Sequence, residues 1–432
     1  METPAIPQIP PQIPPIPPPE QHPPEQPRER PPERKKKRFS TIVIVSLLLV
    51  CLVAGGFIGY SISYSSFNSK LTSIQNQLAA HAQNDTYNTY PNATYIIGEN
   101  ASLSTLYAEV KSSVVVIQDV VTSETFLGEV LSTQQGSGFI TAVNSQLVIV
   151  TNNHVVNGAT NITITFANGA TYPGTEIGSD PLADLAVLTI SPMPSGLVPL
   201  TLVSSVNLQV GQPVVAVGSP YGLQGTLTTG VISSLERTLS ETEPDGSQGP
   251  TIPDTIQTST PINPGNSGGP LLTYAGEVVG ITTAAVSNSN GLGFAIPSAT
   301  IIRELGTIVS TGTYDNHPSI DTTGVDMSYQ LAQAMHTTVT YGYLVESASG
   351  QNGLKGGTTQ VTILGQNYAI GGDIIIGVNG TTITNTDTLL SYLERNTLPG
   401  QTVSFTVVRD GTTQTVPVTI DNLSSSSSSL SA

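Results

Sequence analysis

The sequence predicts a mainly β protein. Short apolar segments recur along the chain, and Gly, Asn and Pro separate them. Short strands with frequent turn signals are typical of a β-sandwich or a β-barrel, and the residues alone leave both open. The clearest segments are Val114 to Ile117, Ile162-Ile164-Phe166 in strict alternation, Leu185 to Ile190, Val214 to Val217 and Val278 to Ile281.

A glycine-rich run, NPGNSGGP from Asn263 to Pro270, makes Ser267 the leading candidate for a nucleophile. The glycines let the backbone turn tightly and aim the N–H groups of Gly265 and Ser267 at one point, where an oxyanion would develop. A serine hydroxyl also needs an adjacent base, because it is a poor nucleophile at its free pKa. Taken alone, the run is equally compatible with a surface turn, since Asn, Gly, Ser and Pro are turn residues.

Histidines are few, five in 432 residues, and one has the setting of a catalytic base. His154 follows Leu147 to Thr151, an apolar run that reads as a strand, and a strand end is a rigid place from which to project a base. Of the others, His22 lies in a proline tract, His81 in a polar stretch, His317 before a proline and His336 far downstream.

The carboxylate expected to orient His154 is Asp184, which stands directly before another apolar run, Leu185 to Leu188. Asp180 competes for this role, but it precedes a proline in a turn-like setting, so Asp184 is preferred. The chain order His154, Asp184, Ser267 is one of the known orders of a serine protease triad.

Six motifs in one order resemble those of the HtrA/Deg serine proteases. They are QGSGFI at 135–140, TNNHVV at 151–156, DLAVL at 184–188, GSPYGLQGTLTTGVIS at 218–233, NPGNSGGPL at 263–271 and GLGFAIP at 291–297. The resemblance covers residues 101 to 310 strongly and continues more weakly to 421. It implies a chymotrypsin-like double β-barrel, with His154, Asp184 and Ser267 as the triad and Gly265 and Ser267 as oxyanion donors.

The same resemblance places the pocket for the residue before the scissile bond between Ser259–Ile262 and Asn290–Phe294. Pro261, Ile262 and Leu292 are the S1 candidates, and no charged residue stands on either wall. A small or medium aliphatic side chain is the expected guest, because an uncompensated charge is costly to bury. The alternative is that Ile262 and Leu292 belong to the barrel core.

Residues 318–421 resemble a PDZ-like α/β domain of the HtrA type. A strand runs from about Gly371 into an Asn-Gly turn, and a short helix follows from about Thr386. Such domains bind an extended peptide as an added strand, and the candidate peptide-binding residues are Ile320, Gly324 and Val325. Two departures leave a structural or oligomer-contacting role open for this domain. The expected carboxylate-binding segment reads IDTTGV and lacks the usual apolar residues around Gly324, and an insertion lies at 358–369.

The first 38 residues are a separate module that holds 14 of the 32 prolines and 7 of the 14 Lys and Arg residues. This composition favours polyproline II, either as a docking segment or as a solvated tail. A transmembrane helix is expected in 39–62, because Ile42 to Tyr60 is long and apolar enough to cross a bilayer. A cleaved signal peptide is the rival, and the length of the charged and apolar regions favours an anchor.

Five cations, Arg34 to Arg38, precede this span and place the amino terminus in the cytoplasm and the remainder outside. The expected parts are then a stalk at 63–103, a trypsin-like protease domain at 104–312, the PDZ-like domain at 318–421 and a Ser-rich tail at 422–432. This layout resembles that of DegS-like, membrane-anchored members of the family. Six Asn-x-Ser/Thr sites follow the span, as an exterior location requires for glycosylation: Asn84, Asn92, Asn100, Asn161, Asn379 and Asn422.

Charge and composition argue against several classes of partner and cofactor. Beyond residue 38, 7 cations face 25 acidic residues, which argues against nucleic acid because phosphate needs a basic surface. No Cys/His ligand cluster is present in the sequence, and acyl transfer at serine requires neither a metal nor a cofactor, so none is expected. The single cysteine, Cys51, lies in the predicted span and allows no intrachain disulfide.

The expected function is that of a membrane-anchored serine endopeptidase that cleaves unfolded or damaged proteins outside the cytoplasm, in protein quality control. The alternatives are a proteolytically silent chaperone or peptide-binding scaffold, and a regulatory protease specific for one membrane partner. The resemblance also implies a homo-oligomer, a trimer. Leu71, Ile74 and Leu78 form an apolar stripe in the stalk that would assist its assembly.

Overall fold

The computed structural model describes residues 102–125, 128–219, 225–242, 248–285, 292–349 and 352–423. The chain divides by its contacts into one unit that ends at Thr86 and another that begins at Tyr87, and every described residue belongs to the second. The expected cytoplasmic tail and transmembrane helix, the stalk up to residue 101 and the serine run therefore lie outside the described residues. Within the described ranges, no helix combines the length and the apolar character that a membrane crossing needs.

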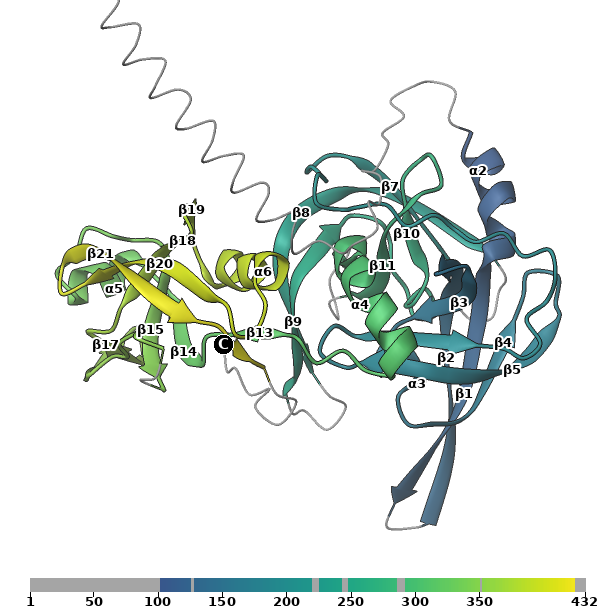
Figure 1. Cartoon of the computed structure of the whole chain (residues 1–432), viewed down its shortest axis with the longest axis horizontal. Helices are drawn as coiled ribbons and strands as arrows, with labels where there is room; N and C mark the ends of the chain where they lie inside the picture. Colours follow the sequence, from purple (N-terminus) through teal and green to yellow (C-terminus); the bar gives the residue numbers. More distant parts are fainter. Residues whose placement is uncertain are drawn as a thin grey trace, which may run out of the picture. The chain divides into compact units, whose positions relative to one another are not determined.

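Two closed six-stranded β-barrels form the first part of the described chain (Figure 1). Strands of the first barrel are hydrogen-bonded in the order β1-β2-β3-β6-β5-β4. Their bounds are β1 Val114–Thr125, β2 Gly128–Val143, β3 Gln146–Thr151, β4 Ala159–Thr165, β5 Thr171–Asp180 and β6 Leu185–Thr189. Alternate residues of β1, Val115 and Ile117, are fully buried inside the ring, because successive side chains of a strand point to opposite faces.

The second barrel closes in the order β10-β11-β12-β9-β8-β7. Its strands are β7 Pro213–Gly218, β8 Thr226–Thr242, β9 Gln248–Thr258, β10 Pro270–Leu272, β11 Val278–Ala285 and β12 Gly293–Pro297. Both rings are closed by hydrogen bonds, so the barrel and not the sandwich is the fold. Sequence alternation could not separate the two, because each buries one face of every strand.

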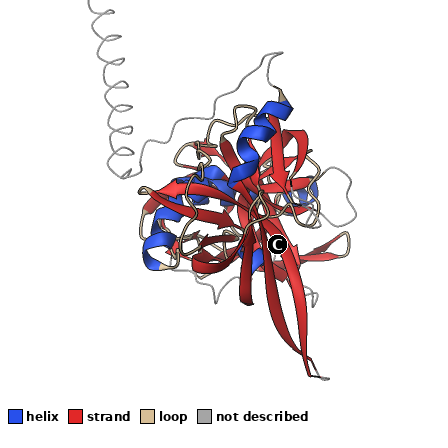
Figure 2. Ribbon diagram, turned by 90° about the vertical axis from the view of Figure 1, so that its right-hand side faces the viewer, coloured by secondary structure: helices blue, strands red, loops and turns tan. Residues whose placement is uncertain are grey.

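One hydrophobic cluster takes side chains from both barrels and from two helices. The helices are α2 (Leu103–Val110), which a 3-10 turn η1 (Lys111–Ser113) extends, and α4 (Ser298–Thr311). Leu106 and Ile308 belong to this cluster, so each helix packs its apolar side on the barrels. Helix α4 is followed by Gly312, whose φ of 91° gives the left-handed cap that glycine favours. Strands make up most of the described chain in Figure 2, and helices make up a smaller part.

The PDZ domain is a sheet in the order β14-β15-β18-β20-β21, with β19 paired to β18. Its strands are β14 Thr322–Asp326, β15 Tyr343–Ala348, β18 Ile374–Val378, β19 Thr381–Thr382, β20 Thr402–Arg409 and β21 Thr412–Thr419, and its helices are α5 Tyr329–Ala334 and α6 Thr386–Asn396. Asn379 and Gly380 have φ values of 47° and 84°, which form the predicted Asn-Gly turn. The Asn385 side chain caps α6 by accepting from Thr388 N–H.

Two further strand pairs complete the domain. The insertion at 358–369 folds into a hairpin of its own, β16 (Thr359–Ile363) with β17 (Gln366–Ile370). Strand β13 (Pro318–Ser319) pairs with β22 (Asp421–Asn422), so the segment that enters the domain lies beside the segment that leaves it.

Helix α6 is fastened to the second barrel by Arg395. Its Nε donates to Asp254 Oδ2 at 2.6 Å, and its Nη1 donates to Glu236 Oε1 at 3.1 Å. Nη2 lies 2.6 Å from Asp254 Oδ1 as an ion pair that lacks hydrogen-bond alignment. Glu236 and Asp254 have φ values of 58° and 62°. Two left-handed residues on β8 and β9 thus aim their carboxylates at one guanidinium.

Burial raises the pKa of Asp254 to about 6, although Arg395 opposes the rise. The folded protein therefore keeps a proton on Asp254 between about pH 4 and pH 6, where the unfolded chain has lost it. Stability should fall as pH rises through this window, by an amount on the order of 2–3 kcal/mol, and should level off above it.

Asp254→Asn should remove this pH dependence, because asparagine has no proton to lose. The check is the melting temperature of an inactive Ser267→Ala protein, with and without Asp254→Asn, across pH 4 to 7. Asp387, which bonds Arg237 and Thr238 at the same junction, supplies the control Asp387→Asn. An equal slope in the Asp254→Asn protein would contradict the assignment.

Candidate active site

His154 belongs to a short helix that begins as soon as strand β3 ends. The helix is α3, Asn153–Val156. Asn153 N–H donates to Asp184 O at 3.1 Å, and the Asn152 side chain donates to the same carbonyl at 3.0 Å. The sequence predicted a base at a strand end, and the structure adds one helical turn that these two bonds hold against the β5–β6 connection.

The carboxylate of Asp184 is buried and engages His154 twice. His154 Nδ1 lies 2.9 Å from Oδ2, and His154 N–H donates to Oδ1 at 2.9 Å. Thr283 Oγ1 donates to Oδ2 at 2.7 Å. Because a carboxylate only accepts hydrogen bonds, the contact between His154 Nδ1 and Asp184 Oδ2 favours a proton on Nδ1. Nε2 of the same ring is then the accepting nitrogen. With 2% of its surface exposed, the carboxylate is screened from water and relies on these donors.

Asp180, the competing carboxylate, makes different contacts. Its Oδ1 accepts from Leu182 N–H at 2.9 Å and from Ala183 N–H at 3.3 Å. Its Oδ2 lies 2.8 Å from His317 Nε2. Asp184 is therefore the carboxylate that contacts His154, in agreement with the preference drawn from the sequence.

Ser267 lies in the loop between β9 and β10, and neighbouring strands fix its backbone. Ser137 N–H donates to Ser267 O at 2.8 Å, and Gly268 N–H donates to Thr282 O at 2.8 Å. The Ser267 hydroxyl donates to Thr283 O at 2.5 Å. Thr283 consequently contacts two of the three predicted triad residues, one through its carbonyl and one through its hydroxyl. Sequence reasoning missed Thr283, because nothing in the run Thr282-Thr283 marks it.

Gly265 adopts a φ of 96°, in the left-handed region where glycine carries no penalty. Its carbonyl accepts from Ser137 Oγ at 2.6 Å, and Ser137 Oγ in turn accepts from Ser219 N–H at 2.9 Å. Among the described residues, neither Gly265 N–H nor Ser267 N–H donates to a protein acceptor. The loop therefore has two backbone donors available beside the Ser267 hydroxyl.

The expected S1 residues lie on two segments that touch. Ile262 is buried and packs in the core of the second barrel, as the alternative interpretation of this residue described, whereas Pro261 is exposed. Leu292 is 38% exposed. A Cβ added to Gly293 would lie 2.6 Å from Ile262 Cγ1. The backbone at Gly293 thus closes directly on the segment that precedes the nucleophile loop.

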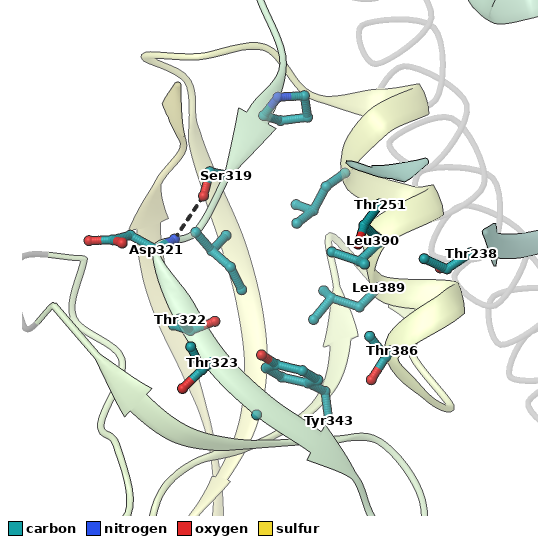
Figure 3. Close-up of a pocket in the computed structure, with 14 residues that line it drawn as sticks. Thr238, Thr251, Ser319, Asp321, Thr322, Thr323, Tyr343, Thr386, Leu389 and Leu390 are labelled. Atoms are coloured by element: carbon teal, nitrogen blue, oxygen red, sulfur yellow. Dashed lines mark hydrogen bonds between the residues drawn. The ribbon is translucent and has the colours of Figure 1, made fainter. Parts of the chain in front are cut away.

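A mostly apolar groove lies between β14 and α6 (Figure 3). Ile320 and Gly324 line it, as do Tyr343 and Leu389. Val325, the third residue predicted for peptide binding, packs instead in a separate cluster with residues such as Met327 and Leu344. Thr238 and Thr251 of the second barrel also line the groove, a contribution that no sequence signal indicated.

Comparison with known protein families matches two regions of the chain. The trypsin-like peptidase domain matches residues 136–281, and the PDZ domain matches residues 349–420. The first region contains the His154, Asp184 and Ser267 contacts, and the second contains α6.

Curated relatives extend the match across both domains. The serine protease PepD of Mycobacterium tuberculosis is 36% identical over 326 residues, which are 71% of this chain and 64% of the relative. The chloroplastic Protease Do-like 1 of Arabidopsis thaliana is 36% identical over 322 residues, 73% of this chain and 71% of the relative. The chain belongs to the HtrA/Deg family of serine-type endopeptidases.

A solved structure of this HtrA type has the same architecture. The HtrA-type protease AlgW with tripeptide is 27% identical, with a TM-score of 0.55, and covers 75% of this chain and 98% of that one. The chain is thus similar in fold to a solved HtrA-type protease over three quarters of its length.

Thr283→Ala should slow turnover by about tenfold to a hundredfold with little change in KM, because it removes a hydrogen bond to a buried carboxylate. The measurement is steady-state cleavage of a chromogenic peptide. Thr283→Ser keeps the hydroxyl and is expected to restore most of the rate. Equal rates for the alanine and serine variants would show that the hydroxyl has no part in holding Asp184.

Proposed function

We propose that His154, Asp184 and Ser267 form the catalytic triad of this HtrA protease. The hydrogen-bonded arrangement of His154 on buried Asp184 carries the proposal. His154 Nε2 takes the proton of the Ser267 hydroxyl while Oγ attacks the scissile carbonyl, and the imidazolium then protonates the leaving amine. Water, activated by the same nitrogen, hydrolyses the acyl-enzyme.

A rotation of Ser267 precedes this chemistry. Its hydroxyl has one proton, and that proton is donated to Thr283 O. The side chain must leave this carbonyl and turn to His154 before the base can accept the proton. In this conformation the Ser267 hydroxyl is therefore hydrogen-bonded to a backbone carbonyl, and substrate binding or a loop rearrangement must break that bond.

The N–H groups of Gly265 and Ser267 serve as the proposed oxyanion donors. Two unpaired donors beside the nucleophile suit a tetrahedral oxyanion, and fixed donors stabilise charge without reorganisation. The bond from Ser137 Oγ to the Gly265 carbonyl holds the Gly265–Asn266 peptide unit, which lies between the two donors.

The proposed substrates are unfolded or damaged proteins cut after small or medium aliphatic residues, consistent with uncharged S1 walls. The groove beside β14 is proposed to take a free peptide terminus, because β14 is the edge strand of its sheet and offers unpaired backbone groups. Its structural or oligomer-contacting role remains the alternative.

A peptide series tests both statements about selection. Cleavage after alanine or valine should exceed cleavage after lysine, since the walls offer lysine no counter-charge. A labelled peptide with an apolar residue and a free carboxylate at its end should bind Ser267→Ala protein more tightly than its amidated twin. Preference for lysine would overturn the S1 proposal, and equal binding would favour the structural role of the groove.

The proposed setting is outside the cytoplasm, with residues 39–62 as a single-pass anchor and the chain assembled as a trimer. The apolar run at Ile42 to Tyr60 and the five preceding cations support the anchor and its orientation.

Labelling with a fluorophosphonate tests the catalytic proposal directly. The unaltered protein should react covalently and digest an unfolded protein such as reduced casein, whereas Ser267→Ala should do neither. Ser310→Ala, which alters an exposed serine on α4, is the matched control and should retain labelling. A folded protein that never labels would favour the silent scaffold, and digestion of one membrane partner alone would favour the regulatory protease.

A further inference from the structure

Three side chains that could hold a metal ion converge at a second buried cluster, which includes Asp180, the residue four positions before Asp184 of the proposed triad. Asp180 ends β5, Glu304 lies on α4, and His317 precedes β13. Their exposed fractions are 1%, 0% and 3%. One ligand atom from each lies within 4.8 Å of the others. The charge of a buried carboxylate must be balanced by a nearby positive charge or proton, because an isolated charge is costly away from water.

Each of the three side chains has one atom that contacts a residue outside the cluster. Leu182 N–H and Ala183 N–H hold Asp180 Oδ1. Arg303 donates to Glu304 Oε1. Glu394 Oε1 lies 3.4 Å from His317 Nδ1. Such outer partners are what orients the ligands of a metal site, including the carboxylate behind a ligating histidine.

The remaining ligand atoms of the three side chains are Asp180 Oδ2, Glu304 Oε2 and His317 Nε2. Glu304 Oε2 is fully buried and has no hydrogen-bond partner among the described residues. Asp180 Oδ2 and His317 Nε2 are 2.8 Å apart. A buried carboxylate oxygen without a donor needs a cation or a proton beside it.

The buried group has a negative net charge, and two further positive charges would neutralise it. Asp180, Glu304 and Glu394 are three carboxylates, and the guanidinium of Arg303, which contacts both glutamates, supplies one positive charge. With His317 neutral, the balance is two negative charges in a buried volume. A divalent cation neutralises them, and so do two protons, one on His317 and one on Glu304.

We propose that Asp180, Glu304 and His317 form a structural site for one divalent zinc-type ion. One imidazole nitrogen and two carboxylate oxygens are ligands that Zn²⁺ accepts, whereas Ca²⁺ and Mg²⁺ prefer shells of oxygen alone. The ion would join β5 and α4 of the protease domain to the segment that enters the PDZ domain. It takes no part in acyl transfer, so the site is independent of the proposed triad.

The competing account is a metal-free cluster that holds two protons. Although burial alone would lower the pKa of His317, its hydrogen bonds to Asp180 and Glu394 raise that pKa to about 10. Burial also raises the pKa of Glu304 well above its ordinary value. Zn²⁺ must displace these protons, so it should bind more tightly as pH rises.

Zinc titration of the purified full chain with Ser267→Ala, stripped with a chelator, tests the proposal. We expect one Zn²⁺ per chain by calorimetry and elemental analysis. The melting temperature should rise by roughly 5 °C when free Zn²⁺ is about a hundredfold above Kd. Co²⁺ should give visible absorption bands of low coordination number.

Two substitutions locate the ion. Glu304→Gln and His317→Gln keep the size of the side chain but remove a ligand, and each should weaken zinc binding at least tenfold and abolish the Co²⁺ bands. His336→Gln changes an exposed histidine and should have no effect. His154→Ala removes the proposed catalytic base as a rival ligand and should leave the stoichiometry unchanged.

Two results would overturn the proposal. One is the lack of stoichiometric zinc binding by the chain with all three ligands present, which would favour the metal-free cluster that holds two protons. This measurement does not depend on the folding of a ligand variant. The other is binding that His154→Ala removes and His317→Gln does not, which places the ion at the triad. Protease activity is not read in any of these measurements, so failure here leaves the catalytic proposal standing.

Discussion

The buried carboxylate of Asp184 is the constraint on which the site depends. Its side chain accepts from His154 of the first barrel and from Thr283 of the second, and its backbone carbonyl accepts from Asn152 and Asn153. Asp184 itself has a φ of 52°, a left-handed conformation that aspartate adopts more readily than most residues. One residue in an uncommon conformation thus joins the two barrels at the point where they must meet for catalysis.

Thr283 shows how the second barrel enters that arrangement. Its hydroxyl supports Asp184 and its carbonyl holds the Ser267 hydroxyl, so β11 controls the orienting carboxylate and the nucleophile together. The loop around Gly265 is fixed from the first barrel through Ser137. Because each barrel positions groups of the other, movement of one barrel against the other would disturb the proposed base, the proposed nucleophile and the proposed oxyanion donors at once.

Charged side chains join the PDZ domain to the protease domain. Arg395 reaches two carboxylates on left-handed residues of β8 and β9, and Arg303 contacts Glu394 of α6. Buried pairs of this kind are poor sources of stability, but they demand accurate geometry. Thr238 and Thr251 line the groove of the PDZ domain, so a peptide in that groove would contact the protease domain directly.

The sequence by itself determined the elements and the chemistry. Short apolar runs, and alternation at Ile162-Ile164-Phe166, located several of the strands, and the Asn-Gly pair located a turn. The motifs TNNHVV, DLAVL and NPGNSGGP indicated a base, a carboxylate and a nucleophile. These signals are local and depend on few neighbours. The apolar pattern left barrel and sandwich open, the family resemblance implied the barrel, and the closed rings of the structure confirmed it. Only the tertiary structure placed Val325 away from the groove and brought Asp180 to His317, a histidine that looked like a loop residue before a proline. Those outcomes depend on hydrogen bonds and burial between segments more than a hundred residues apart in several cases, as with Asp180 and His317, and no local pattern carries such pairings.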